Sequence, residues 1–257
     1  MYSDERKAMI LKHILRTGIT PVTSLLEIAG VSIATLRRDL RQLSDENLIE
    51  KSHGTVRIKN TNSLSGIPID DDPFADAKMK IAQNAAKLIN DGDRIFIGAG
   101  KTCTYLVKHF SQNENLVVVT TNINAVMELA NAKKHTMFLL GGNIHIGSNY
   151  IETLDEYTVD SLKNLYFDKV FITVNGIDLD YGYSINSRLQ VPLYRHLLTN
   201  TSDFFLLADG SKYGKRAFAT FCEMDKIKNV VTCPDIDPVY MAFYKKNNVR
   251  VYGQRAD

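Results

Sequence analysis

Five short segments rich in glycine and polar residues could together bind an anion. They span residues 98–102, 121–122, 141–143, 175–178 and 209–212, and each directly follows an apolar run. Glycines let backbone N–H groups approach an anion closely, helix N-termini add positive potential, and the ammonium groups of Lys101 and Lys212 add charge. The segments therefore predict a site for a phosphate-bearing ligand, provided that the fold brings them together.

A second group of chemically active residues lies on a predicted helix near the N-terminus. Its apolar stripe consists of Leu36, Leu40 and Leu43, whereas Thr35, Arg37, Arg38 and Arg41 lie away from that stripe. Exposed arginines on a helix can contact the phosphates and base edges of duplex DNA. They could instead be charges on an ordinary solvated face, but the neighbouring elements favour the DNA-binding interpretation.

Those neighbouring elements have the pattern of a winged helix-turn-helix. Apolar residues at helical spacing predict a first helix over residues 5–17, and a second helix follows Thr20-Pro21. Ser32 is expected to cap the third, basic helix. Residues 48–58 have the pattern of two short strands that turn near Gly54, which would form the wing. We therefore predict a DNA-binding domain over residues 1–58.

Beyond residue 77, strand-like runs alternate with helical stretches, which is typical of a mostly parallel sheet covered by helices. The predicted strands are 94–97, 116–120, 136–140, 169–174, 204–208 and 229–232. In such a fold the carboxyl ends of the strands lie at one edge, where ligands bind. One polar segment alone could be an ordinary turn, but five segments with two lysines favour a site. The fold class is thus α/β, with the larger domain over residues 78–257.

Residues 59–77 are predicted to be a linker between the two domains, because Asn, Ser, Gly and Pro are frequent there. The acidic run at residues 70–72 is interpreted as solvated charge, and we assign it no functional role.

Composition and motifs exclude several classes of protein. The formal net charge of +2 is too small for a general nucleic-acid coat, so DNA binding must rest on local charge. Three unclustered cysteines indicate free thiols, and no run approaches the ~18 apolar residues that a membrane helix needs, so we expect a cytoplasmic protein without a membrane partner. Gly100-Lys101-Thr102 does not complete a nucleotide-binding P-loop, because Ile95 occupies the position of the required glycine. We predict neither a cofactor nor a metal site.

Two regions of the sequence resemble the DeoR family of bacterial transcription regulators. Its helix-turn-helix signature is similar to residues 31–40 (VSIATLRRDL) and 52–54 (SHG). Its sensor domain is similar to residues 79–82 (MKIA), 120–122 (TTN), 140–142 (LGG), 175–178 (NGID) and 208–214 (ADGSKYG). The resemblance implies a winged head that binds operator DNA as a dimer or tetramer, and a sensor fold shared with ribose-5-phosphate isomerase and glucosamine-6-phosphate deaminase. It also implies a sugar-phosphate effector whose binding loosens the hold on DNA.

This chain departs from the family pattern at four positions. The family usually has aspartate where this chain has Gly98, threonine where it has Lys101, glutamate where it has Gln190, and a second wing glycine where it has Thr55. The changes at 98 and 101 make the pocket more positive. We therefore expect a more anionic effector, or one with a different pattern of hydroxyl groups.

Individual residues can be given roles on this basis. Base contacts are expected from Thr35 and Arg37, and phosphate contacts from Ser32, Arg38, Lys51 and His53. In the larger domain, we expect Gly100, Lys101 and Thr102 to hold the phosphate. Asn122 and Gly142 would line the crevice. Asp178 and Lys212 would reach the sugar.

These expectations describe a repressor of a sugar-metabolism operon that acts as a homo-oligomer. The alternative from another class is a sugar-phosphate isomerase or deaminase with an appended DNA-binding domain. Such an enzyme needs a general base, commonly a carboxylate, beside the substrate carbonyl. The positions where the resemblance would place acids hold Gly98, Asn175 and Gln190, so binding without turnover is expected. An activator or an architectural DNA-binding protein, the third alternative, would show no effector-dependent release.

Overall fold

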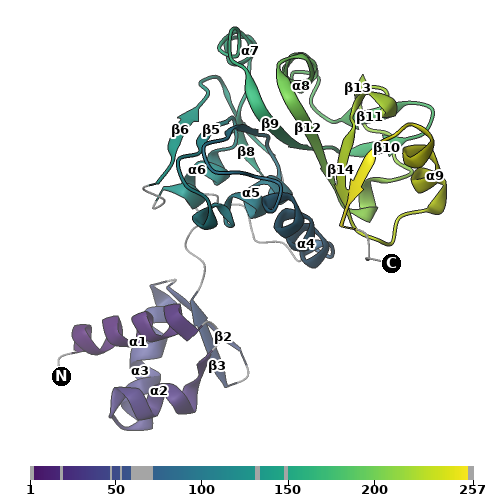
Figure 1. The fold of residues 1–257 in the computed structure, drawn as a ribbon. Coiled ribbons are helices and arrows are strands. Elements are labelled where there is room, and N and C mark those ends of the chain that lie inside the picture. The colour runs from purple at the N-terminus through teal and green to yellow at the C-terminus, as the bar shows by residue number, and fades with distance from the viewer. Residues whose placement is uncertain are drawn as a thin grey trace. The chain divides into compact units, whose positions relative to one another are not determined.

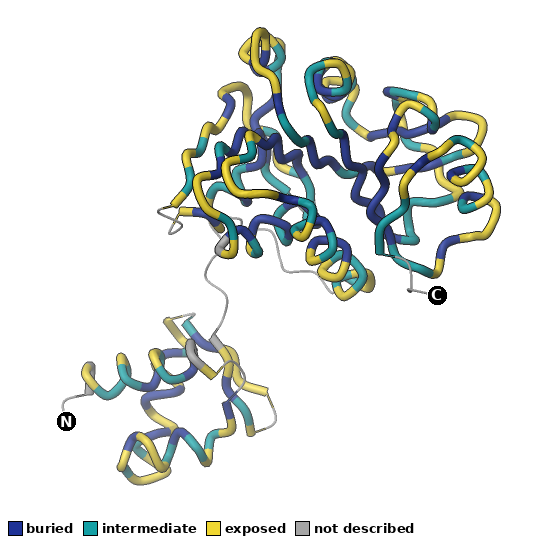
Figure 2. The backbone as a smooth tube through the Cα atoms, in the orientation of Figure 1, coloured by how far each residue is buried: buried dark blue, intermediate teal, exposed yellow. Residues whose placement is uncertain are grey.

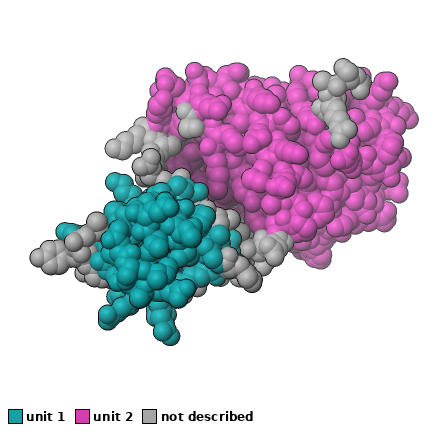
Figure 3. Space-filling model, turned by 90° about the horizontal axis from the view of Figure 1, so that it is seen from below, with its two compact units in different colours: residues 1–68 teal, residues 69–257 magenta. Residues whose placement is uncertain are grey.

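The computed structural model describes residues 3–17, 20–46, 48–52, 54–58, 72–130, 134–147 and 150–253. The chain divides into two compact units, Met1–Pro68 and Ile69–Asp257, which Figure 3 shows in separate colours. Residues 59–71 of the predicted linker lie outside the described residues. Its last three residues, 75–77, belong to helix α4 (Ala75–Ala86).

The smaller unit has the predicted winged helix-turn-helix architecture (Figure 1). Its helices are α1 (Ser3–Thr17), α2 (Val22–Ala29) and α3 (Ile33–Asp45). Its strands are β1 (Thr20–Pro21), β2 (Ile49–Ser52) and β3 (Thr55–Ile58), in the antiparallel order β1-β3-β2. The hairpin β2–β3 is the predicted wing, and β1 adds a strand that the sequence pattern did not predict.

A compact apolar core holds the helices of this unit together. It contains Ile10, Ile14, Leu25, Leu36, Leu40, Leu43, Ile49 and Val56, all at most 2% exposed. The sharp turn between α2 and α3 depends on Gly30, whose φ of 59° is left-handed and whose N–H donates to the Leu26 carbonyl at 3.2 Å. Leu36, Leu40 and Leu43 therefore point inward, which leaves the opposite face of α3 outside the core.

The larger unit is built on a seven-stranded sheet in which every neighbouring pair is parallel. Its strands are β4 (Arg94–Ile97), β5 (Val117–Thr120), β6 (Thr136–Leu139), β9 (Phe167–Thr173), β12 (Thr201–Ala208), β14 (Asn229–Thr232) and β15 (Arg250–Tyr252), in the order β15-β14-β12-β9-β4-β5-β6. The first six strands coincide closely with the six predicted strands, which confirms the α/β class. The short edge strand β15 was not predicted.

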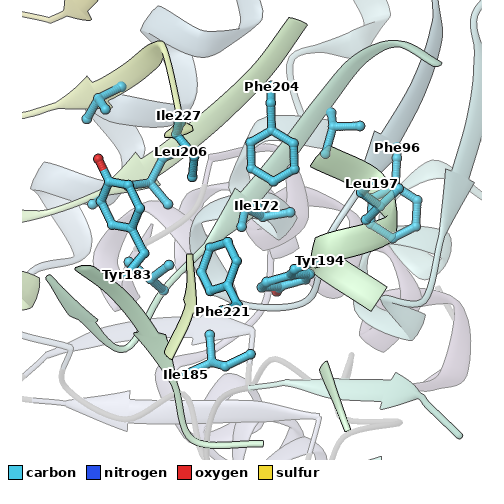
Figure 4. Packing of buried hydrophobic residues seen from close by; sticks show 14 of the residues in the cluster. Phe96, Ile172, Tyr183, Ile185, Tyr194, Leu197, Phe204, Leu206, Phe221 and Ile227 are labelled. Atoms are coloured by element: carbon cyan, nitrogen blue, oxygen red, sulfur yellow. The ribbon is translucent and has the colours of Figure 1, made fainter. Parts of the chain in front are cut away.

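Helices and small strands cover both faces of this sheet (Figures 1 and 2). On β4, Ile95 and Ile97 join one buried cluster and Phe96 joins the other. The first cluster includes side chains of α4, α5 (Lys101–Val107) and α6 (Ile123–Leu129). The second includes side chains of α8 (Gln190–Thr199) and α9 (Pro238–Lys246), and part of it is shown in Figure 4. Because successive side chains along the strands join opposite clusters, both faces of the sheet are buried.

Shorter elements complete the larger unit. They are the hairpin β7 (Ile144–Ile146) and β8 (Ile151–Thr153), helix α7 (Glu156–Asp160), and a sheet of β10 (Gly176–Asp178), β11 (Gly182–Ile185) and β13 (Ala219–Cys222). Cys103, Cys222 and Cys233 form no disulfide with one another, as expected from the sequence.

Candidate functional site

The outer face of α3 carries the predicted DNA-contacting arginines. Arg37, Arg38 and Arg41 are all exposed, while Leu36, Asp39 and Leu40 on the opposite face are buried. Arg37 and Arg41 lie four residues apart and Arg38 lies beside them, so the three share one face of the helix. This face offers a continuous row of guanidinium groups to solvent.

These arginines also lack partners within the described part of the molecule. Arg37, Arg38 and Arg41 make no ion pair or hydrogen bond there. By contrast, Arg57 pairs with Glu50 across the wing at 2.7 Å. A charge that is satisfied internally needs no external partner, so the unpaired guanidinium groups of α3 are the ones available to an anion such as DNA phosphate.

The first turn of α3 is held by a side-chain cap, as predicted. Ser32 Oγ accepts a hydrogen bond from the Thr35 N–H at 3.2 Å and lies 2.9 Å from Thr35 Oγ1. The two hydroxyls, each predicted to contact DNA, are therefore bonded to each other in the free protein. Ile33, which is 42% exposed, and the exposed Ala34 occupy the same surface as the arginines. Apolar groups of this kind can contact a thymine methyl group, and the sequence analysis overlooked them.

The wing places a further cation on the surface of this unit. Lys51 on β2 is exposed, and Gly54 has the positive φ of 82° that its tight turn requires. The Gly54 carbonyl accepts a hydrogen bond from the Val22 N–H at 2.9 Å, which ties the wing to the start of α2. His53, predicted to contact phosphate, lies outside the described residues.

In the larger unit, all five polar segments follow strands of the same parallel sheet. The strands concerned, β4, β5, β6, β9 and β12, are contiguous and parallel, so the segments lie at one edge. After β4 the chain continues outward to β5 and β6, and it then returns to β9 on the other side of β4. The position between β4 and β9 is therefore a topological switch point, where ligands bind in open α/β sheets.

The turn after β4 is shaped by close packing at this switch point. Gly100 has a φ of 107°, and a Cβ atom there would lie 2.6 Å from Thr173 Oγ1. Thr173 Oγ1 donates to the Ala99 carbonyl at 3.0 Å, which joins the end of β9 to the turn. Thr102 is 4% exposed and lies inside the unit. Of the predicted phosphate-holding residues, Lys101 is therefore the one that brings charge to the edge.

Two lysines, Lys78 and Lys101, contact two carboxylates at this edge. Lys78 of α4 lies 2.8 Å from Asp72 Oδ2, Lys101 lies 3.4 Å from the same oxygen, and Lys78 lies 3.9 Å from Asp209 Oδ2. Burial lowers the pKa of Lys212 and nearby Lys78 lowers it further, against the opposing attraction of Asp209 and Asp72. We define the lysine cluster as Lys78 and Lys101, which share the Asp72 carboxylate, together with Lys212, which makes no described ion pair with Asp72 or Asp209 but whose pKa is influenced by Lys78, Asp209 and Asp72.

Asp72 is not the solvated charge that the acidic run at residues 70–72 predicted. The Asp72 carboxylate is only 8% exposed. Burial alone would raise its pKa, but hydrogen bonds from Lys78 and the Phe74 N–H outweigh burial and bring the pKa below its ordinary value. Asp72 is therefore held as an anion among the lysines. Lys78 was missed as well, because it reaches the edge from a helix and not from a strand end.

Two buried oxygens near the sheet edge have no hydrogen-bond partner. Asp209 is 1% exposed; its Oδ1 accepts from the Ser211 N–H at 2.9 Å, while its Oδ2 accepts no hydrogen bond. The hydroxyl of Thr121, at the end of β5, is also buried without a partner. Unsatisfied buried polar groups are costly, so they mark places where a ligand or water could supply the missing bond.

Three predicted effector contacts are engaged elsewhere. Asn122 is fully buried; it donates to the Gly98 carbonyl and to Thr104 Oγ1, and it accepts from the Ala125 N–H. Asp178, the last residue of β10, pairs with Arg216 at 2.7 Å. A Cβ atom on Gly142 would lie 2.3 Å from Thr158 Oγ1, so this glycine is explained by packing. Asn122 therefore joins the turn after β5 to the turn after β4. Neither Asp178 nor Gly142 is joined to the lysine cluster by a described contact.

A buried acid that the sequence analysis did not identify lies on β8. Glu152 is 1% exposed, pairs through its backbone with Asn122, and accepts hydrogen bonds from Gln190 Nε2 at 2.9 and 3.1 Å. Burial raises its pKa to about 7, although the Gln190 hydrogen bond opposes the shift. The Glu-to-Gln departure at position 190 thus places an amide donor, and not a second acid, against this carboxylate.

The raised pKa of Glu152 makes the stability of the larger unit depend on pH. Because the folded state binds this proton more tightly than the unfolded state, stability should fall as pH rises from about 4.5 to about 7. Glu152→Gln should remove the cost of the buried charge and stabilise the unit by about 2–3 kcal/mol at pH 8. At pH 5, where Glu152 is already protonated, it should change stability little.

Urea unfolding at several pH values would measure this effect. Glu156→Gln is the matched control, because Glu156 is exposed on the neighbouring helix α7. If Glu152→Gln shifted stability equally at pH 5 and pH 8, the carboxylate would not be the titrating group.

Other kinds of site find no support in the described residues. Within the described ranges, no three His, Cys, Asp or Glu residues gather where they could hold a metal ion. A hollow of about 460 Å³ is lined by Arg195, Thr220, Phe221, Cys222, Glu223 and Lys226, none of which belongs to the lysine cluster. It contains none of the predicted effector residues and no unsatisfied polar side chain, so the lysine cluster remains the better candidate. No helix in the described part of the chain has the length and apolar character to cross a membrane.

Comparison with known proteins gives matches to both units. A family model described as the DeoR C terminal sensor domain matches residues 74–233, and one described as a DeoR-like helix-turn-helix domain matches residues 6–62. The lactose phosphotransferase system repressor of Staphylococcus epidermidis is 30% identical over 235 residues, covering 89% of this chain and 91% of that protein. The Bacillus subtilis transcriptional regulator IolR is 24% identical over 249 residues, covering 94% of this chain and 95% of that protein. The putative aga operon transcriptional repressor of Escherichia coli O157:H7 is 23% identical over 252 residues, covering 97% and 93%.

Similarity to solved structures is looser. Ribose 5-phosphate isomerase A from Methanocaldococcus jannaschii aligns with a TM-score of 0.39 and 17% identity over 55% of each chain. The eIF2B delta subunit from Chaetomium thermophilum aligns with a TM-score of 0.41 and 18% identity over 60% of this chain and 55% of that chain. TM-scores this low support no argument about function.

Proposed function

Because the chain belongs to the DeoR family of transcription regulators, we propose that it represses a sugar-metabolism operon and releases its operator when a phosphorylated sugar binds the lysine cluster. The curated relatives include repressors named for lactose transport and for the aga operon. The observation that carries the DNA-binding part is the row of unpaired, exposed arginines on α3.

We infer the docking of DNA from the geometry of winged helix-turn-helix domains, in which the third helix enters the major groove. Thr35 and Arg37 would contact bases, and Arg38, Arg41 and Lys51 would contact phosphates. Ser32 would act mainly through its cap, which fixes the first turn of α3. Binding as a dimer or tetramer would place two such helices on a symmetric operator.

The lysine cluster supports the effector part of the proposal. Its ammonium groups suit a phosphate, and Asp209 Oδ2, which accepts no hydrogen bond, could accept one from a sugar hydroxyl. A thermal-shift screen against a panel of sugar phosphates would identify the effector, because a ligand that binds only the folded state raises its melting temperature. If no sugar phosphate stabilised the protein, the effector proposal would be wrong.

The effector found in this way allows a direct test of Lys212. Lys212→Ala should bind operator like the wild type but need at least about tenfold more effector for release, because one charge-assisted contact is lost. Fluorescence anisotropy of labelled operator during an effector titration would measure the release. Lys215→Ala is the control, since Lys215 is exposed in the same loop. Release at wild-type effector concentrations would remove Lys212 from the site.

One observation supports the alternative that the chain is an enzyme: the buried Glu152 carboxylate lies near the sheet edge, where a general base would be needed. However, both of its oxygens accept hydrogen bonds from Gln190, and the residue is 1% exposed, so it is poorly placed to take a proton from a substrate. We therefore propose binding without turnover. An assay of the purified protein for ribose 5-phosphate isomerisation tests this directly, and turnover that Glu152→Gln abolished would establish the alternative.

A further inference from the structure

Asp72 connects the lysine cluster to the part of the chain that arrives from the DNA-binding unit. It is the first described residue after the segment 59–71. Its Oδ2 lies 2.8 Å from Lys78 Nζ and 3.4 Å from Lys101 Nζ, and the carboxylate is 8% exposed. The other oxygen, Oδ1, accepts from the Phe74 N–H at 3.1 Å. This carboxylate therefore occupies the place where an external anion would contact the two lysines.

We propose that Asp72 is an internal anion that holds the lysine cluster in the absence of effector, and that the effector phosphate must displace it in order to bind. The inference rests on the proposed function, because it assumes that the lysine cluster receives the phosphate. It explains why the site would select phosphorylated sugars over unphosphorylated ones. It also suggests how phosphate binding could affect the chain that leads from the DNA-binding unit.

Selection of phosphorylated sugars follows from competition between the Asp72 carboxylate and the effector phosphate for the same lysines. A neutral sugar cannot replace a carboxylate that pairs with two ammonium groups, whereas a phosphate dianion brings more charge and more acceptor oxygens. The site thus rejects unphosphorylated sugars even when their hydroxyl groups would fit Asp209. An external anion can bind only to the fraction of molecules in which Asp72 has left the lysines. The apparent affinity for any anion is therefore reduced by that fraction.

The other hydrogen bonds of Asp72 link phosphate binding to the turn at which the chain enters the larger unit. Its side chain holds the Phe74 N–H, and its carbonyl accepts from the Ala75 N–H at 2.9 Å, at the first residue of α4. Displacement of Asp72 would break the bond to Phe74 and loosen the turn at which the chain enters the larger unit. Binding of phosphate is thereby linked to the end of the segment that leads from the DNA-binding unit.

Titration calorimetry of the full chain with inorganic phosphate tests the inference, using Asp72→Asn, Asp76→Asn and Lys101→Ala. Asparagine keeps an acceptor for the Phe74 N–H but removes the competing charge, so Asp72→Asn should bind phosphate about tenfold or more tightly than the wild type. Asp76→Asn makes the same charge change on an exposed residue of α4 and should stay within about twofold of the wild type. Lys101→Ala should lose phosphate binding.

The outcomes separate the inference from the function on which it rests. If Lys101→Ala lost binding while Asp72→Asn bound like the wild type, the lysine site would stand and the role of Asp72 would be refuted. An equal gain in Asp76→Asn would also refute it, because only overall charge would matter. If Asp72→Asn bound no phosphate, both the inference and the proposed site would fail. Hydrogen exchange gives a second readout: phosphate should speed exchange of the wild-type Phe74 amide, and an unchanged rate would contradict displacement.

Discussion

Replacing both Arg37 and Arg38 with alanine should abolish specific binding to operator DNA at physiological salt while the protein remains folded. Both side chains are exposed and have no intramolecular partner among the described residues, so their loss costs the fold little. A base-contacting arginine contributes about 1–3 kcal/mol, which corresponds to about a 5- to 150-fold change in affinity. A phosphate-contacting arginine adds a salt-dependent contribution.

The single variants distinguish the two roles. Arg37→Ala should lose discrimination at one operator position, whereas Arg38→Ala should weaken binding to all sequences and reduce the salt dependence by about one released ion. Fluorescence anisotropy at several salt concentrations would measure both. Lys12→Ala, which removes an exposed charge from α1, is the control. Wild-type affinity in the double variant would show that α3 does not face DNA.

Asp39→Ala should strongly destabilise the DNA-binding unit without affecting the larger unit. Asp39 is 3% exposed and accepts hydrogen bonds from Arg6 Nε at 2.6 Å and Arg6 Nη2 at 3.1 Å, which fastens α1 to the inner side of α3. Removing Asp39 takes from the part-buried Arg6 guanidinium the carboxylate that accepts two of its hydrogen bonds, and losing one member of such a pair is destabilising. A domain of about 60 residues has little stability in reserve. We expect its melting temperature to fall by more than about 10 °C.

Calorimetry would detect this as the loss of one transition and the retention of another. Operator binding should be lost, while stabilisation by the effector should persist. Asp45→Ala is the control, because Asp45 is an exposed acid on the same helix. If Asp39→Ala melted like the Asp45 variant, the ion pair would not stabilise the unit.

The fold could be predicted largely because its signals are local. Leu36, Leu40 and Leu43 at helical spacing fix the inner face of α3, and the apolar run at residues 94–97 is the strand β4. Two of the strands that escaped prediction, β1 and β15, are short, and each pairs with a strand from which at least one helix separates it in the chain. Thr20–Pro21 forms β1 only because β3 lies beside it, and Arg250–Tyr252 forms β15 only by pairing with β14.

The candidate site was less predictable, because its charges come from residues that are not neighbours in sequence. Lys101 and Lys212 could be linked through the rule that parallel strands end at one edge. Lys78 and Asp72 could not, since nothing in their local sequence indicates that a lysine of α4 and an acid of the predicted linker meet there. Asn122 and Asp178, also predicted from segments that follow strands, make bonds within the fold. Their contacts with an effector stay predictions.

The pairing of β4 with β9 has a consequence for how the molecule is made. The Arg94 N–H bonds to Asp168, 74 positions along the chain, and this contact lies in the middle of the sheet. The central ladder cannot close until β9 has left the ribosome, whereas the wing hairpin is complete by residue 58. Long-range parallel pairing is slow compared with local helical and hairpin contacts. The DNA-binding unit can therefore fold on a nascent chain before the sheet of the larger unit is complete.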